Sequence, residues 1–161
     1  MENLFAKDKF LYVTRKELFY AAVMLHLKRL VNVVYDFPAD NIKFDQELNE
    51  AKNSLRKKKL LTESARNGIS LDFALCVCAA FCANPESCEL VENDDYHATI
   101  YQFGTAYMLM EKRSEDELAA VWFLSKETLD EYIATKISAP LEEVSEKSEE
   151  TMKGEENVTR S

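Results

Sequence analysis

The feature that most constrains the fold is a change of periodicity near Pro85. From 73 to 83 almost every residue is apolar or Cys, which predicts a short helix with no solvated face, the central buried element. Beyond Asn84-Pro85, side chains alternate with a period of two and β-favouring residues become dense. The expected strands are 88–91, 96–103, 105–111 and 118–124. Turn residues lie between them, so an antiparallel meander is predicted.

Helical patterns precede this change. Residues 9–13 form a short strand or extended entry, and Thr14-Arg15-Lys16-Glu17 is a capping box that starts a helix running to about Asn32. Pro38 requires a loop after it. A second helix is expected over 44–59, because apolar residues step by four, three and four along one face while Lys57, Lys58 and Lys59 crowd its end.

Two further segments complete the expected elements. Asn67-Gly68 is a turn signal followed by a brief strand over 69–71, with Ser70 or Asp72 available to cap the apolar helix. Ser125 is expected to cap a last helix over 126–137. The fold class is therefore α+β, an antiparallel meander sheet packed with about four helices.

Length and composition predict one domain and a tail. The chain has 161 residues, of which 47% are hydrophobic, which suits one core over 1–137. Residues 138–161 hold 7 acidic and 3 basic residues and hardly any apolar ones, so a disordered acidic tail is expected.

The net charge restricts the classes of partner that the chain can bind. The chain has 20 Lys and Arg against 29 Asp and Glu, a net charge of −9, which disfavours nucleic acid. No segment approaches a membrane span and no targeting segment is recognisable. We expect a soluble cytoplasmic protein that does not bind membranes.

The residues that could bind a metal or take part in catalysis are not grouped at the spacing of a known site. Cys76 and Cys78 would point to opposite sides of a helix, so these thiols, with Cys82 and Cys88, are expected to be buried and free rather than metal ligands. His26 and His97 stand alone, and the paired carboxylates lie in expected turns. The three glycines include no phosphate-binding loop. We therefore expect neither an enzyme nor a bound cofactor or metal.

The meander holds the candidate binding residues. Aromatic and Met side chains are favoured where proteins dock, because they offer a large contact area at low entropic cost. The candidates are Tyr96, Tyr101, Phe103, Tyr107, Met108 and Trp122. The alternative is that these rings form the sheet's own core, since alternation places Tyr101 and Phe103 on the face opposite Ile100.

The order of segments resembles a known family. A first helix with a Phe-Pro loop, a helix entering Asn53-Ser54-Leu55-Arg56-Lys57-Lys58-Lys59-Leu60-Leu61, the strand 69–71, an apolar helix ending Ala83-Asn84-Pro85-Glu86 and the strands from Cys88 follow one another. Over about 10–135 this resembles one half of the EspG-type chaperones of bacterial type VII secretion, which have an "L-x-x-K/R-G-L" step. Here that step has Lys59 in place of glycine.

The resemblance implies a cytoplasmic chaperone that covers the apolar tip of a helical secretion substrate. Those chaperones are built from two similar halves and this chain is about half as long. We therefore expect a homodimer, or a heterodimer with a related half, through 96–124.

Two alternatives stay open. A winged-helix DNA-binding regulator would place helix 44–59 in a major groove and use the Asn67-Gly68 turn as its wing. Its cations would be Lys52, Arg56, Lys57, Lys58 and Lys59. An immunity or adaptor protein would need only a complementary surface, so the sequence does not separate it from a chaperone.

Overall fold

The structure is a computed structural model that describes residues 10–36 and 38–138. The described chain divides into two compact units. The first runs to Glu92 and resumes over His97–Leu124, and the second joins the Asn93–Tyr96 turn to the segment from Ser125 onward. The chain is α+β, as expected.

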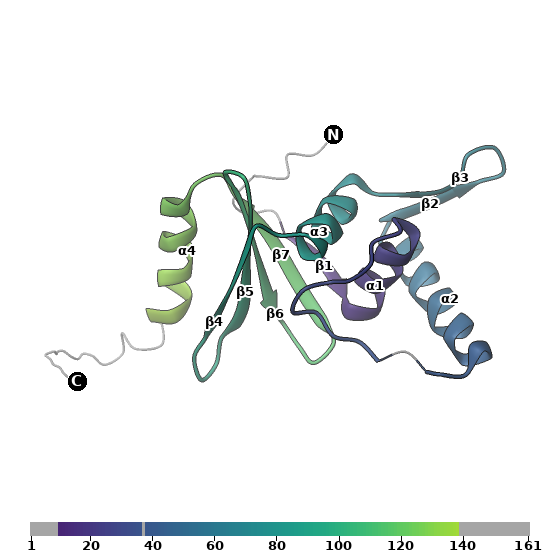
Figure 1. The fold of residues 1–161 in the computed structure, drawn as a ribbon, viewed down its shortest axis with the longest axis horizontal. Helices are drawn as coiled ribbons and strands as arrows, with labels where there is room; N and C mark the ends of the chain where they lie inside the picture. Colours follow the sequence, from purple (N-terminus) through teal and green to yellow (C-terminus); the bar gives the residue numbers. More distant parts are fainter. Residues whose placement is uncertain (1–9, 37, 139–161) are drawn as a thin grey trace, which may run out of the picture. The chain divides into compact units, whose positions relative to one another are not determined.

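The first unit contains a five-stranded antiparallel sheet with the order β1-β7-β6-β5-β4 (Figure 1). Four of its strands follow one another in the chain: β4 (Ser87–Glu92), β5 (His97–Phe103), β6 (Ala106–Lys112) and β7 (Glu117–Phe123). The predicted meander is confirmed. Gly104 turns the chain between β5 and β6 with a φ of 62°, which is costly for a side chain with a Cβ.

The fifth strand comes from the start of the described chain. β1 (Leu11–Thr14) lies against β7, with Leu11 opposite Ala120 and Val13 opposite Leu118. The sequence indicated an extended segment here but not its partner, because pairing between strands far apart in the chain leaves no local signal.

Three helices and a hairpin complete this unit and lie to one side of the sheet (Figure 1). They are α1 (Arg15–Met24), α2 (Asn41–Lys57), β2 (Leu61–Ser64), β3 (Gly68–Leu71) and α3 (Phe73–Ala83). α1 packs against both α2 and α3. Leu18, Leu55 and Leu75 are fully buried in the resulting core.

The first helix is shorter than predicted. It ends at Met24 rather than near Asn32, because His26 takes a φ of 59°. The amide of His26 donates to Val23 O at 3.2 Å and that of Leu27 to Ala22 O at 2.9 Å, which is a Schellman motif. The loop that follows α1 places Leu30 in the core.

The second helix begins earlier than predicted and ends close to the expected residue. Asp40 accepts hydrogen bonds from Ile42 N at 2.8 Å and Lys43 N at 3.2 Å, so the helix starts at Asn41 rather than 44. It ends at Lys57, and Lys59 lies in the left-handed region with a φ of 65°.

The second unit contains α4 (Lys126–Ser138), and the predicted helix over 126–137 is confirmed. Thr128 N donates to Ser125 Oγ at 3.2 Å, the expected cap. The predicted tail over 138–161 lies outside the described residues apart from Ser138. Within the described ranges, no helix is both long and apolar enough to cross a membrane.

Candidate functional site

Three of the six predicted binding residues lie in the core. Tyr101 and Met108 are 0% exposed and Trp122 is 2% exposed. Tyr101 lies opposite Met108, and Met108 opposite Trp122, so the three form a row across β5, β6 and β7. This row faces the helices and belongs to their hydrophobic cluster. The expectation that these side chains offer a surface is therefore corrected, because an antiparallel sheet uses one face for its own core.

The other three differ from one another. Phe103, at the end of β5, is 51% exposed. Tyr107 is half-buried on β6, opposite Gln102 and Phe123. Tyr96 is half-buried in the second unit. Of the predicted set, Phe103 is therefore the large apolar side chain most accessible to a partner.

The exposed apolar surface next to Phe103 comes from α3. This helix buries Leu75, Cys78 and Cys82 on one side. On the other side, successive positions four and three apart are Phe73, Val77 and Ala80. Phe73 is 55% exposed, so the expectation of a helix without a solvated face is wrong.

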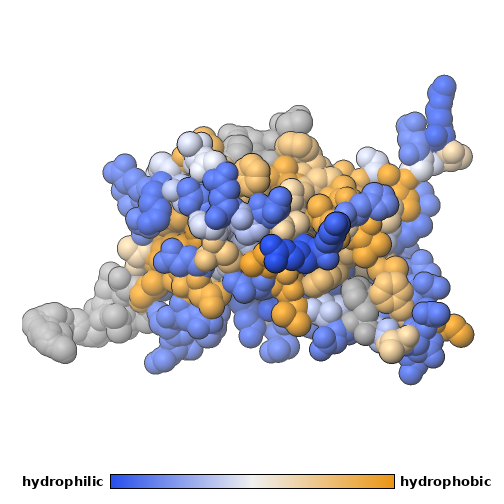
Figure 2. Space-filling view, in the orientation of Figure 1, coloured by the Kyte–Doolittle hydropathy of each residue, from blue (hydrophilic) through white to orange (hydrophobic). Residues whose placement is uncertain are grey.

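We define the apolar patch as Phe73, Val77, Ala80, Phe81 and Phe103. The ring centroids of Phe81 and Phe103 are 6.1 Å apart, which joins the helix to the end of β5. Figure 2 shows hydrophobic residues gathered over α3. The sequence did not reveal this patch because both sides of the helix are apolar, so periodicity carries no information about which side is covered.

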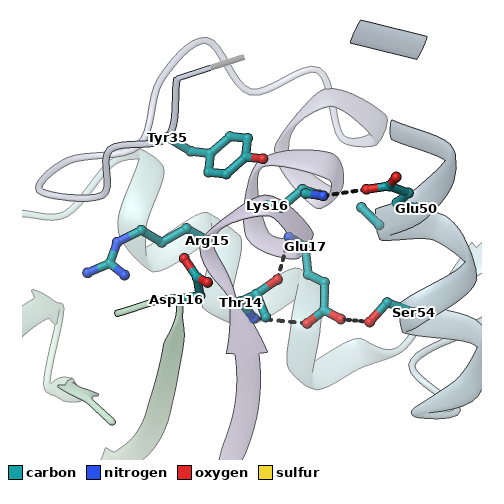
Figure 3. Close-up of a pocket in the computed structure, with 9 residues that line it drawn as sticks. Thr14, Arg15, Lys16, Glu17, Tyr35, Glu50, Ser54 and Asp116 are labelled. Carbon is teal, nitrogen blue, oxygen red and sulfur yellow. Dashed lines mark hydrogen bonds and ion pairs between the residues drawn. The ribbon is translucent and has the colours of Figure 1, made fainter. Parts of the chain in front are cut away.

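A cavity of about 370 Å³ lies between the start of α1, α2 and the start of β7 (Figure 3). Its lining is mainly polar and charged. The residues are Thr14, Arg15, Lys16, Glu17, Tyr35, Glu50, Ala51, Ser54 and Asp116. This is the candidate for small-molecule chemistry, so the state of its ionisable groups decides what it can do.

Glu17 is held by four groups at one side of this cavity. The carboxylate accepts Thr14 N at 2.9 Å and the Lys58 ammonium at 2.7 Å, and it also accepts the Ser54 hydroxyl. Glu17 N in turn donates to the Thr14 hydroxyl at 3.1 Å, which confirms the predicted capping box. A buried carboxylate with these partners joins α1 to α2 structurally.

Lys16 is also engaged. Its ammonium lies 2.7 Å from Glu50 and 3.0 Å from Glu47. Burial lowers the pKa of Lys16, but the hydrogen bonds to Glu50 and Glu47 outweigh it, and the pKa lies above the usual lysine range. The Tyr35 hydroxyl donates to Glu47, and this bond followed by that from Lys16 lowers the pKa of Glu47.

Two of the ionisable groups that line the cavity are engaged within the protein. Glu17 accepts hydrogen bonds from its neighbours, and Lys16 lies against Glu50. A nucleophilic lysine needs a lowered pKa, and that of Lys16 is raised. These bonds connect α1, α2 and the loop of Tyr35.

None of the four cysteines forms a disulfide. Cys78 and Cys82 are fully buried, whereas Cys76 and Cys88 are half-buried. A hydrogen bond to Cys82, with burial, raises the pKa of the Cys78 thiol. Within the described ranges, His, Cys, Asp and Glu side chains form no group of three or more suited to a metal ion.

The basic end of α2 is largely paired with carboxylates. Glu63 on β2 lies 3.2 Å from Lys52 and 2.6 Å from Arg56. The Lys58 ammonium lies 2.7 Å from the carboxylate of Glu17. Three of the five cations of the winged-helix alternative are therefore engaged within the protein, which reduces the charge available to a phosphate backbone.

No protein-family model matches the chain, and no curated protein matches it.

Proposed function

We propose that this protein is a non-catalytic protein-binding module that docks an apolar helical segment of a partner on the apolar patch. The observation that carries the proposal is the exposure of two phenylalanines, Phe73 at 55% on α3 and Phe103 at 51% at the end of β5, with the ring of Phe81 on α3 beside that of Phe103. α3 carries no charged residue, so a polar partner would lose hydration there without gaining hydrogen bonds. Exposed apolar side chains that gather on one surface mark interaction sites.

The specific form of the proposal is a chaperone or adaptor for a helical type VII secretion substrate, acting in the cytoplasm. The conformation of Lys59 supports the resemblance on which this form rests. In the EspG-type step glycine follows Lys or Arg, and here Lys59 takes a φ of 65°, which glycine adopts without strain. The residue type differs from that step, while the backbone follows the conformation that glycine would favour.

Co-purification with matched variants tests the proposal. Wild-type protein should retain a helical partner from its native cell, and the double change Phe73→Glu with Phe103→Glu should lose it. Ile42→Glu is the matched control, because Ile42 is 70% exposed on α2, outside the apolar patch. Equal retention by all three proteins, or capture of no helical chain, would reject the patch as the docking site.

The expected dimer, a homodimer or a pair with a related half, belongs to the same proposal. Because Tyr101 and Met108 are buried, a contact through 96–124 would have to use residues such as Phe103 and Tyr107. Light scattering over a wide concentration range, with Phe103→Glu and Tyr107→Glu, decides whether the chain associates there.

A further inference from the structure

The two edges of the sheet differ in how far they are protected. β1 has four residues, and Lys58 Nζ donates to the Tyr12 carbonyl oxygen at 3.3 Å. β4 has six residues, and among the strands of 10–36 and 38–138 only β5 pairs with it, on one side. An unprotected edge strand can add a further strand through its backbone.

The hairpin bonds identify which residues of β4 face this open edge. Asn93 N donates to Tyr96 O at 2.9 Å, and in an antiparallel pair such bonds recur at every second residue. Residues 87, 89 and 91 therefore bond to β5. The N–H and C=O groups of Cys88, Leu90 and Glu92 consequently point away from the sheet.

A cavity of about 260 Å³ lies on the face of the sheet that the helices cover, and it reaches β4 at Leu90 and Glu92. Its other lining residues include Arg15, Asn32, Val33, Tyr101, Met110 and Leu118, so only its β4 end can receive a side chain of the added strand. Leu90 is 58% exposed there. In strand addition, backbone bonds supply affinity and pockets for alternate side chains supply specificity.

The charge along β4 indicates which kind of strand could pair with it. Glu86, Glu89 and Glu92 are all exposed along the six residues of β4 and the residue before it. A second copy would bring two such rows together on chains of net charge −9, and the acidic segment 139–161 would be repelled likewise. An extended segment with Lys or Arg opposite Glu89 and Glu92, which are three residues apart and so point to opposite faces of the sheet, would be attracted.

We infer that β4 is a docking site for an extended, basic segment of another protein, which adds as a sixth strand outside β4. Its apolar residue lies opposite Leu90, and its cations lie opposite Glu89 and Glu92. The site is independent of the apolar patch, so it stands even if the proposed docking of a helix fails.

A designed peptide tests the site. Opposite residues 92 to 87, an antiparallel strand would read Lys-Thr-Leu-Lys-Val-Thr, so this peptide carries a fluorophore and is titrated with the full-length protein. The matched peptide Glu-Thr-Leu-Glu-Val-Thr should bind at least about tenfold more weakly. Absence of binding by the basic peptide would overturn the inference.

Leu90→Pro separates strand addition from plain charge attraction. It removes an outward N–H while leaving residues 89 and 91 bonded to β5, and proline is tolerated at edge strands in this position. The basic peptide should bind Leu90→Pro about tenfold more weakly. Unchanged affinity would show electrostatic attraction without pairing and would overturn the inference.

A charge exchange keeps the test valid if Leu90→Pro does not fold. Glu89→Lys with Glu92→Lys changes two exposed side chains and should reverse the preference in favour of the acidic peptide. Hydrogen exchange on the wild type gives a direct readout, since the basic peptide should slow exchange at Cys88, Leu90 and Glu92. Dimer formation that excludes the peptide would instead assign β4 to a second copy.

Discussion

Lys58 at the end of α2 donates a hydrogen bond of 2.7 Å to the carboxylate of Glu17 in the first turn of α1. The two residues are 41 positions apart in the sequence. Glu17 is 1% exposed, and its hydrogen-bond partners are this ammonium, Ser54 and the Thr14 amide. One carboxylate thereby caps a helix and joins it to its neighbour.

Lys58→Met should lower the free energy of unfolding by about 2 kcal/mol, because it leaves a buried carboxylate with one donor fewer. Adding Glu17→Gln should cost less in this background than in the wild type, since the charge to be satisfied is gone. Urea unfolding measures both. Lys57→Met, an exposed neighbour, is the control. Strict additivity of the two changes would mean that the pair is not coupled.

Lys59→Gly should stabilise the protein. Lys59 closes the Schellman motif after α2, with Leu60 N donating to Leu55 O at 2.9 Å, and its φ of 65° is strained for a side chain with a Cβ. We expect a gain of about 0.5–1 kcal/mol in thermal or urea unfolding. Lys59→Ala removes the same charge but retains the Cβ, so it should change stability little. A loss on Lys59→Gly would argue against the left-handed conformation.

Tyr101→Phe should lower stability by about 1 kcal/mol, since it leaves a part-buried carbonyl without its donor. The Tyr101 hydroxyl donates to Val31 O at 2.6 Å and so holds the loop after α1 against the sheet. Burial raises the pKa of this phenol, so its absorbance should not titrate as that of free tyrosine does. Phe103→Ser, at an exposed ring, should cost much less. Similar losses from the two changes would contradict the assignment of Tyr101 to the core and Phe103 to the surface.

The pH dependence of Glu47 should reflect its partners. Hydrogen bonds from Tyr35 and then Lys16 hold its pKa below the ordinary value of 4.5. A carboxyl whose pKa is lower in the folded protein contributes stability that is present above 4.5 and is lost as the pH falls through the folded value. Tyr35→Phe should therefore raise the pKa of Glu47 in a carbon NMR titration. An identical titration in wild type and variant would show that the Tyr35 bond does not lower the pKa of Glu47.

Duplex DNA should not bind measurably near physiological salt. Lys52 and Arg56 are paired with Glu63, and the net charge is −9. Fluorescence anisotropy at low and physiological salt measures this. Tight, sequence-dependent binding that Lys57→Glu abolishes would instead favour the winged-helix alternative.

The sequence alone determined the features that depend on neighbouring residues. The capping box of Thr14 and Glu17, the turn glycines Gly68 and Gly104, and the alternation of the meander strands each act over a few residues, so they can be identified without a structure. The order of helices and strands followed from them except for β2, which was not predicted and which pairs with β3 across the Gly68 turn.

Only the tertiary structure decided which surfaces are covered. Period-two alternation divides a strand into two faces but does not say which face receives the helices, so Tyr101 and Trp122 were predicted to bind a partner although they lie in the core. On α3, apolar residues on both sides conceal that Phe73 faces outward. The pairing of β1 with β7 and the ion pair between Lys58 and Glu17 join residues that are far apart in the sequence. Such contacts form only when the whole chain packs.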